Sequence, residues 1–412
     1  MVRIKPFRGV RPTRELAEKV ASFPYDVLNS EEARKLASDN PYSFLRVVKP
    51  EITLDPGIDL YDDRVYQAAR ENLDKLIQEG ILVQDGENHL YVYRQKMGNH
   101  VQTGLVGCAS ADDYMADRIK KHELTRADKE KDRTRHVYTT NANAGPVFLT
   151  YKAVHEIDAL IEKVTEDEPE YNFVSDDGIG HIFWVIRDKG IIKELESLFA
   201  DMDAVYVADG HHRSASGAKV RDWRKKDNPN HTGEEEYNFF LAVYFPHNQL
   251  AIMPYNRVVK DLNGLTKEQF LAKVSEKFNV EKNEEKEPGY PTNVCMYIDG
   301  DWYTLTAKEG TYPKDDPVHS LDVSILQENL LTPVLGIGDP RTDKRIDFIG
   351  GIRGTKELER LVDNGKFAVA FSMYATSIEQ LIAIADAGKT MPPKSTWFEP
   401  KLRSGLIVHM LD

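Results

Sequence analysis

The sequence predicts an α/β fold built around a mixed sheet, and two observations support this prediction. Strand-like and helix-like segments alternate along most of the chain, a pattern typical of α/β proteins rather than of all-helical or all-strand proteins. The chain has 412 residues, of which 41% are hydrophobic and 29% are charged. This composition is ordinary for a folded globular protein, and the length allows at least two domains or one elaborated core.

The N-terminal hundred residues contain a helix and a hairpin that can be recognised from their patterns. Residues 58–79 carry apolar side chains at helical spacing and are followed by Gly80, a frequent helix end. Residues 90–94 and 101–109 have the composition of strands, and Gly98 lies in the short segment between them. A turn at that glycine predicts a β-hairpin.

A second series of strands and helices begins at Gly145, which places a domain boundary near residues 141–145. We therefore expect an N-terminal α/β region over residues 1–144. Residues 145–412 are expected to form the core, with insertions and a C-terminal closing segment.

The charge and the apolar runs argue against several classes of protein. A formal net charge of −13 disfavours binding to a nucleic-acid backbone. The longest apolar runs, such as residues 239–245, are too short to span a membrane, and no apolar signal segment is seen at the N-terminus. Cys108 and Cys295 are too few for a disulfide scaffold or a structural zinc site. We expect a cytoplasmic protein without nucleic-acid or membrane partners, and a homo-oligomer is compatible with these features.

The most informative segment is an apolar strand that ends in a glycine turn and leads into a helix. The polar residues that follow strand 205–208 are Asp209, Gly210, His211, His212 and Arg213. The glycine permits a tight turn, and the first helical residues leave backbone N–H groups without partners, which suits a phosphate or another anion. Arg213 adds a planar donor fork, and the histidines can exchange protons near neutral pH.

Two interpretations of this segment remain open. In the first, Asp209 caps the helix and His212 packs in the core. In the second, the turn binds an anion, with Arg213 as its main donor. Because consecutive helical residues point in different directions, we expect only one of the two histidines to face a ligand.

A second group of charged residues lies on and just before a predicted helix. Lys129 and Arg133 are one helical turn apart on the same face, and Asp132 lies beside them. A salt-bridged surface helix has the same spacing, so this pattern alone does not establish a site. Glu123 is a candidate general base, because a carboxylate among cationic groups can lie close to bound phosphate and take a proton from a hydroxyl.

A third group lies in the proline-rich segment 391–401. Lys394, Ser395 and Lys401 could contact a ligand if this segment closes over it. The alternative is a connection to the final strand that its prolines make rigid.

Metal and nucleotide signatures are missing. The sequence contains no motif with metal ligands at a characteristic spacing. It also lacks the Walker pattern and the glycine pattern of dinucleotide-binding folds. We therefore expect no protein-held transition metal, even though Asp209, His211, His212 and the His122-Glu123 pair are potential ligands. Magnesium entering with a nucleotide, ATP or ADP, would need only one or two carboxylates.

Taken together, several of these segments resemble a bacterial family catalogued as domain of unknown function 1015. The matching segments are residues 5–9, 24–27, 122–133, 209–213 and 392–402. More distantly, Gly210 and Arg213 resemble two positions of the phosphate-binding box of the ParB and sulfiredoxin superfamily. The resemblance implies a ParB/sulfiredoxin-like core that binds nucleotide phosphates. His211 stands where sulfiredoxin has its cysteine, which argues against reductase chemistry.

The same superfamily includes free-serine kinases, so the resemblance implies a phosphotransferase that acts on a small hydroxyl metabolite. There are two alternatives: a phosphatase that acts on a phosphorylated metabolite such as phosphoserine, and a noncatalytic nucleotide-binding module. The residues expected to act in catalysis are Glu123, His211 and His212. Those expected to hold phosphate or nucleotide are Asp209, Gly210, Arg213, Lys129, Arg133, Lys394, Ser395 and Lys401.

Overall fold

A computed structural model describes all residues from Met1 to Asp412 and divides the chain into two compact units. Unit 1 comprises Met1–Leu250 together with Pro400–Asp412, and unit 2 comprises Ala251–Glu399. Unit 2 is therefore an insertion in the sequence of unit 1. The boundary expected near residue 144 lies inside unit 1, and the chain divides instead after residues 250 and 399.

The sheet of unit 1 explains this difference. Strand β8 (Val147–Tyr151) pairs with β11 (Val205–Asp209) on one side and β12 (Phe239–Pro246) on the other. In turn, β12 pairs with β5 (His100–Ser110), which precedes the expected boundary. Strands from both sides of residue 145 thus share one sheet, and long-range pairing of this kind leaves no local signal in the sequence.

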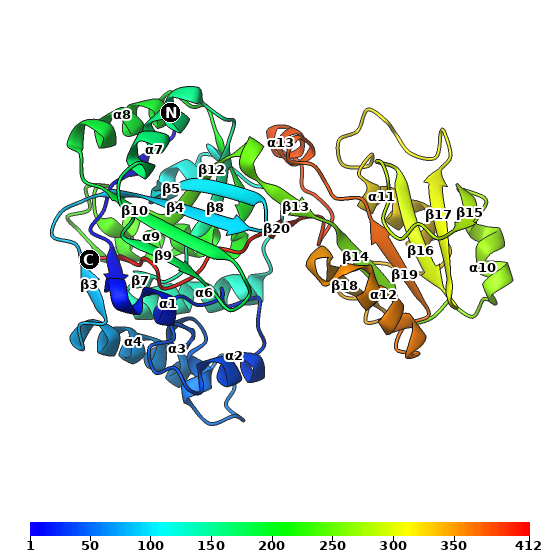
Figure 1. Cartoon of the computed structure of the whole chain (residues 1–412), viewed down its shortest axis with the longest axis horizontal. Coiled ribbons are helices and arrows are strands. Elements are labelled where there is room, and N and C mark those ends of the chain that lie inside the picture. Colours follow the sequence, from blue (N-terminus) through cyan, green and yellow to red (C-terminus); the bar gives the residue numbers. More distant parts are fainter. The chain divides into compact units, whose positions relative to one another are not determined.

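The nine-stranded sheet is mixed, which confirms the predicted fold class (Figure 1). Only the pairs β12–β8 and β11–β6 are parallel. The short strand β1 (Ile4–Lys5) pairs with β5, off the main path. From one edge to the other, the remaining strands are β6 (Ile119–Lys120), β11, β8, β12, β5, β4 (Leu90–Met97), β10 (Gly180–Ile186) and β9 (Tyr171–Val174).

Several helices pack on this sheet in one apolar core. Side chains such as Ile157 and Phe199, from two helices, are buried together with Tyr244 of β12. The helices of this core are α5 (Ala111–Met115), α7 (His155–Thr165), α8 (Lys189–Ala200) and α9 (His211–Asp227). No helix of the structure combines the length and the apolar character that crossing a bilayer requires.

The N-terminal helices form a group of their own beside α6 (Ala127–Thr140) (Figure 1). They are α1 (Ala17–Val20), α2 (Ser30–Ala37), α3 (Leu45–Val48) and α4 (Asp63–Gln78). The helix expected over residues 58–79 is present as α4 but begins later, because the Asp62 carboxylate accepts a hydrogen bond from the Arg64 N–H and caps the helix there. The expected hairpin is confirmed, with Met97 of β4 paired to His100 of β5.

The C-terminal segment of unit 1 returns to the N-terminal strands and helices. Backbone bridges join Ser404 to Ser22 and Val408 to Val10. Two small two-stranded pairs complete the unit: β2 (Val10–Pro12) with β3 (Leu82–Gln84), and β7 (Ala142–Asn143) with β21 (His409–Met410).

Unit 2 has a six-stranded antiparallel sheet of its own. Its strand order is β15 (Phe278–Asn283), β17 (Asp301–Ala307), β16 (Asn293–Ile298), β19 (Val369–Met373), β14 (Tyr255–Val259) and β18 (Ile346–Gly350). A separate pair, β13 (Ala251–Met253) with β20 (Trp397–Glu399), joins the two ends of the unit. Its helices are α10 (Lys267–Val274), α11 (Asp322–Leu326), α12 (Gly354–Asp363) and α13 (Ile378–Asp386).

Helix α9 lies unusually close to the sheet at Gly217. A Cβ atom at this position would lie 2.9 Å from the Cβ of Phe240 on β12, too close for normal packing. The glycine therefore sets the distance between the helix and the sheet, although glycine by itself disfavours a helix interior.

We predict that Gly217→Ala lowers the free energy of unfolding by about 1–3 kcal/mol, the usual cost of overpacking. In a solvent-exposed helix the same change would stabilise the protein. Chemical denaturation followed by circular dichroism measures the effect. Gly57→Ala, where nothing lies within 4 Å of the added Cβ, is the matched control and should change stability little. A more stable Gly217→Ala protein would contradict the prediction.

Candidate functional site

The predicted strand, turn and helix are all present at the candidate site. Strand β11 ends at Asp209, and α9 begins at His211. Gly210 between them has φ 98° and ψ 31°, a left-handed conformation that favours glycine. Because Gly210 occupies the N-cap position, no side chain caps the first turn of α9.

Asp209 is surrounded by basic groups. Its Oδ2 lies 3.3 Å from Arg213 Nη2 and 3.5 Å from Lys401 Nζ. Arg213 also donates a hydrogen bond to the Pro146 carbonyl. Burial would raise the pKa of Asp209, but the positive charges of Lys401 and Arg213 outweigh it and hold the pKa well below its usual range. The carboxylate is therefore ionised.

The two histidines point in different directions, as expected. His211 is buried, its Nδ1 is 4.0 Å from Glu123 Oε2, and its ring meets that of His122 edge to face at 4.4 Å between centroids. His212 Nε2 instead accepts a hydrogen bond from the Arg126 N–H at 3.1 Å. Burial lowers the pKa of both His211 and His212, which favours the neutral form of each ring.

The charged residues of α6 divide between two environments. Lys129 donates to the Tyr61 hydroxyl at 3.1 Å, outside the pocket described below. Arg133 pairs with Asp132 at 2.8 Å and stacks over the Tyr25 ring at 4.2 Å. Burial would lower the pKa of Arg133, but the neighbouring Asp132 and Tyr25 raise it. Of this pair, only Arg133 faces the site.

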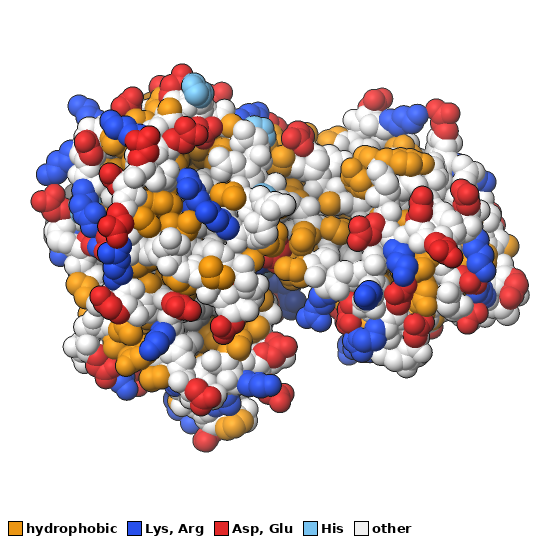
Figure 2. Space-filling view, viewed as in Figure 1, with side chains coloured by type: hydrophobic (Ala, Val, Ile, Leu, Met, Phe, Trp, Pro, Cys, Tyr) orange, Lys and Arg blue, Asp and Glu red, His pale blue; other side chains and the backbone are white.

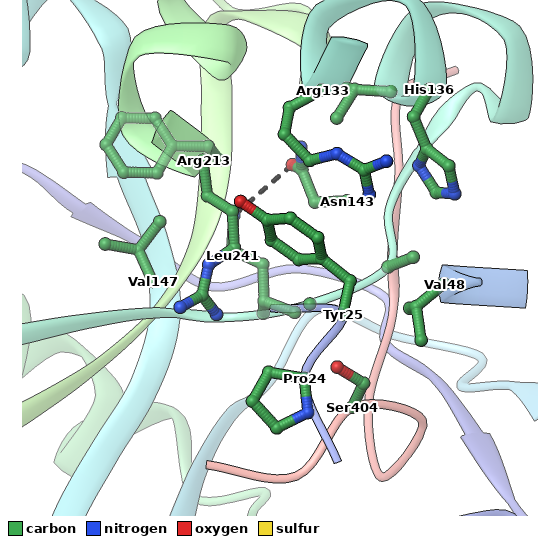
Figure 3. A pocket seen from close by; sticks show the side chains of 14 residues that line it. Pro24, Tyr25, Val48, Arg133, His136, Asn143, Val147, Arg213, Leu241 and Ser404 are labelled. Atoms are coloured by element: carbon green, nitrogen blue, oxygen red, sulfur yellow. Dashed lines mark hydrogen bonds between the residues drawn. The ribbon is translucent and has the colours of Figure 1, made fainter. Parts of the chain in front are cut away.

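Arg133 and Arg213 line one small pocket, a cavity of about 40 Å³ that is open to solvent. Figure 3 shows the Tyr25 ring between these two arginine side chains. The other lining residues are Pro24, Val48, His136, Val137, Asn143, Ala144, Gly145, Val147, Phe240, Leu241 and Ser404.

Sequence reasoning identified the two arginines but gave no role to Tyr25, His136 or Ser404. The segment 24–27 stands out in the sequence only as part of the family resemblance, and nothing local marks His136. His136 is buried, and its Nε2 is 2.8 Å from the Val47 carbonyl. Burial is the main reason why its pKa falls to about 4.

The segment 391–401 spans the boundary between the two units. Lys401 belongs to unit 1 and reaches Asp209, whereas Lys394 and Ser395 belong to unit 2. Within unit 2 the Lys394 carbonyl accepts a hydrogen bond from Arg257 at 3.0 Å, and Ser395 Oγ donates to the Pro392 carbonyl at 2.6 Å. The expected contact of Lys394 and Ser395 with a ligand stays a prediction.

Fold and site together define an α/β protein with a basic pocket at a strand-to-helix turn. The chain belongs to the family described as Protein of unknown function (DUF1015), whose family model matches residues 4–324. This match confirms the family that the motifs suggested. No curated protein matches the chain.

Several solved structures show a weak likeness to the chain. Free serine kinase in complex with AMP is 12% identical, with a TM-score of 0.36, over 72% of this chain and 86% of that one. A conserved hypothetical protein from Pyrococcus furiosus is 11% identical, with a TM-score of 0.35, over 73% of this chain and 93% of that one. SbnI from Staphylococcus aureus, truncated at its C-terminus, is 11% identical, with a TM-score of 0.35, over 71% of this chain and 82% of that one. TM-scores this low do not establish a shared fold.

The conformation and surroundings of Gly210 allow a second prediction about stability. A Cβ atom there would lie 3.0 Å from Arg213 Nε, in addition to the strain of a positive φ. Gly178 also has a positive φ, 79°, but no atom lies within 4 Å of a Cβ added there. The Gly178→Ala variant therefore measures the cost of backbone strain alone, about 1–2 kcal/mol. We expect Gly210→Ala to cost more than Gly178→Ala in chemical denaturation.

The additional loss of stability in Gly210→Ala should disappear in an Arg213→Ala background, because the guanidinium that the new Cβ would crowd is then absent. A double-mutant cycle of Gly210→Ala and Arg213→Ala isolates this coupling. Equal costs of Gly210→Ala in the two backgrounds would show that Gly210 does not position Arg213.

Proposed function

We propose that unit 1 binds a nucleotide or phosphorylated metabolite in this pocket and transfers a phosphoryl group to or from a small hydroxyl compound such as serine. The observation that carries the proposal is the meeting of Arg133 and Arg213, from two different helices, in one pocket beside the Gly210 turn. Two guanidinium groups on one cavity match the charge and the planar geometry of phosphate oxygens.

The turn supplies further donors. The first backbone N–H groups of α9 have no partners within the helix and no side-chain cap. Arg213 Nε is buried without a hydrogen-bond partner, so this guanidinium has an unused donor. In this proposal Gly210 and Arg213 act as the phosphate-holding positions of a ParB/sulfiredoxin-type box, with Lys401 and Asp209 fixing the local charge.

Glu123 is the proposed general base, with His211 or His212 as the alternative. Its side chain is 41% exposed, and its Oε2 lies 4.0 Å from Nδ1 of His211, which opens α9 after the Gly210 turn. The acceptor hydroxyl oxygen would form the new bond to phosphorus, its proton would pass to Glu123, and the bond to the leaving nucleotide oxygen would break. Magnesium bound to ATP or ADP would neutralise phosphate charge, and the carboxylates at the turn are of the type that it accepts.

The acidic surface agrees with a small-molecule ligand. Acidic and basic side chains are interspersed over the face drawn in Figure 2, and the net charge is −13. A nucleic-acid partner would require a continuous basic surface to overcome this charge. We therefore retain a small phosphorylated molecule, and not DNA or RNA, as the proposed partner.

A phosphatase that acts on the same ligand is the second candidate. The Glu123 carboxylate and His211 lie 4.0 Å apart, close enough for one of them to assist an attacking water. Incubation with serine plus ATP or ADP, and separately with phosphoserine, distinguishes the reactions. Phosphoserine formed from serine indicates transfer, and inorganic phosphate released from phosphoserine alone indicates hydrolysis. Tight nucleotide binding with neither product would indicate a noncatalytic module.

We predict that Arg213→Ala and Arg133→Ala each weaken ADP binding by roughly 10- to 100-fold, the effect of losing a charge-assisted hydrogen bond of about 1.5–3 kcal/mol. Isothermal titration calorimetry measures the dissociation constant. Arg213→Lys keeps the charge without the fork and should be intermediate. Arg64→Ala, an exposed arginine paired with Asp62, is the control. Unchanged ADP affinity in folded Arg213→Ala protein would refute the assignment of the pocket.

The role of Glu123 can be separated from binding. Glu123→Gln keeps the shape of the side chain but cannot accept the proton, so we expect kcat to fall by about 100- to 10,000-fold. The ADP dissociation constant should change little. Product formation is followed by mass spectrometry of phosphoserine. If Glu123→Gln retains full turnover, a histidine or another group must move the proton.

A further inference from the structure

Beside the pocket, three potential metal ligands meet at the start of α9. One ligand atom from each of His122, Glu123 and His211 lies within 4.8 Å of the other two. His122 and Glu123 follow β6, whereas His211 opens α9 after β11. The parallel pairing of β6 with β11 brings these two segments together, although they are distant in sequence.

The two imidazole rings hold nitrogen atoms that the protein leaves unpaired. His122 is 2% exposed and His211 is 6% exposed. Both ring nitrogens of His122 and the Nε2 of His211 are buried without a hydrogen bond of normal geometry, although the Val207 backbone lies close to the His122 ring. Buried polar atoms are almost always paired, so three orphaned nitrogens on two touching rings require an explanation. A bound ion would supply a partner for one nitrogen of each ring.

The spacing of the ligands suits one ion after a small adjustment. Metal bonds of about 2.0–2.2 Å to nitrogen and oxygen place the ligands of a tetrahedral site roughly 3.4 Å apart. The three atoms would therefore approach one another by about 1 Å. Glu123 can supply most of this movement, since its side chain is 41% exposed while both histidines are held in the interior.

We propose that His122, Glu123 and His211 bind one divalent first-row transition metal ion, with Zn²⁺ as the most suitable. Two imidazoles and one carboxylate match its preferences, whereas Mg²⁺ and Ca²⁺ favour sites made of oxygen ligands alone. Three protein ligands leave a fourth position for water or a ligand oxygen. The ion is distinct from any magnesium that accompanies a nucleotide.

This site is argued from geometry and does not depend on the proposed phosphoryl transfer. His122 has no role in the proposed reaction, so a loss of metal in a His122 variant and a loss of turnover in Glu123→Gln are separate results.

The test measures metal content directly. Tag-free protein is treated with EDTA, dialysed against Zn²⁺ and analysed by mass spectrometry of the metal, and the affinity is measured by competition with a chromophoric chelator. We expect one Zn²⁺ per chain. His122→Ala and His211→Ala should weaken binding by roughly 100-fold or more, beyond the 10- to 100-fold effect of losing a merely supporting residue. Circular dichroism establishes that each variant is folded.

His212→Gln is the matched control, because this neighbouring histidine already accepts a hydrogen bond from Arg126 and should not alter Zn²⁺ binding. Should a histidine variant fail to fold, Glu123→Gln and the visible spectrum of the Co²⁺-loaded native protein provide a second test. A tetrahedral Co²⁺ spectrum that is lost in Glu123→Gln supports the site. Less than stoichiometric Zn²⁺, unchanged affinity in the folded histidine variants, or the spectrum of hexahydrated Co²⁺ would overturn it.

Discussion

The charge balance around Asp209 is the constraint on which the site depends. A partly buried carboxylate such as that of Asp209 is costly unless cationic groups compensate it, and removal of one partner leaves an uncompensated charge. Here the compensation comes from Arg213 in the first turn of α9 and from Lys401 in the returning C-terminal segment. The end of β11, the start of α9 and this segment are thus held in place by one set of charges.

Each of the two arginines of the pocket is held by partners of its own. Arg213 is oriented by Asp209 and the Pro146 carbonyl, and Arg133 by Asp132 and the Tyr25 ring. Long basic side chains lose considerable freedom when they bind a ligand, so side chains that are already ordered lose less. The pocket therefore combines positive charge with a geometry that the protein has largely set in advance.

Features encoded within a few neighbouring residues could be predicted from the sequence, and features that depend on distant contacts could not. The turn at Gly210 and the hairpin at Gly98 follow from glycine after a strand-like run, and the structure contains both. Helical spacing correctly placed Lys129 and Arg133 one turn apart, but it could not show that one meets Tyr61 and the other Tyr25.

Long-range pairing accounts for what the sequence could not reveal. The position of the domain boundary depends on strands that pair across it, and His122 and His211 meet only because β6 and β11 are neighbours. Such a pair has no short ligand spacing that a motif could reveal, since its members are 89 positions apart in the sequence. Similarly, Lys394 and Lys401 lie in one short segment and yet belong to different units.

The return of residues 400–412 to unit 1 also has a consequence for biosynthesis. Ribosomes deliver a chain from its N-terminus, and compact units generally fold as they emerge. Lys401 and Ser404 are synthesised only after the whole of unit 2. Asp209 therefore lacks one of its two cationic partners while about 190 further residues are made. The nascent protein thus carries an incomplete pocket until residues 400–404 have been made.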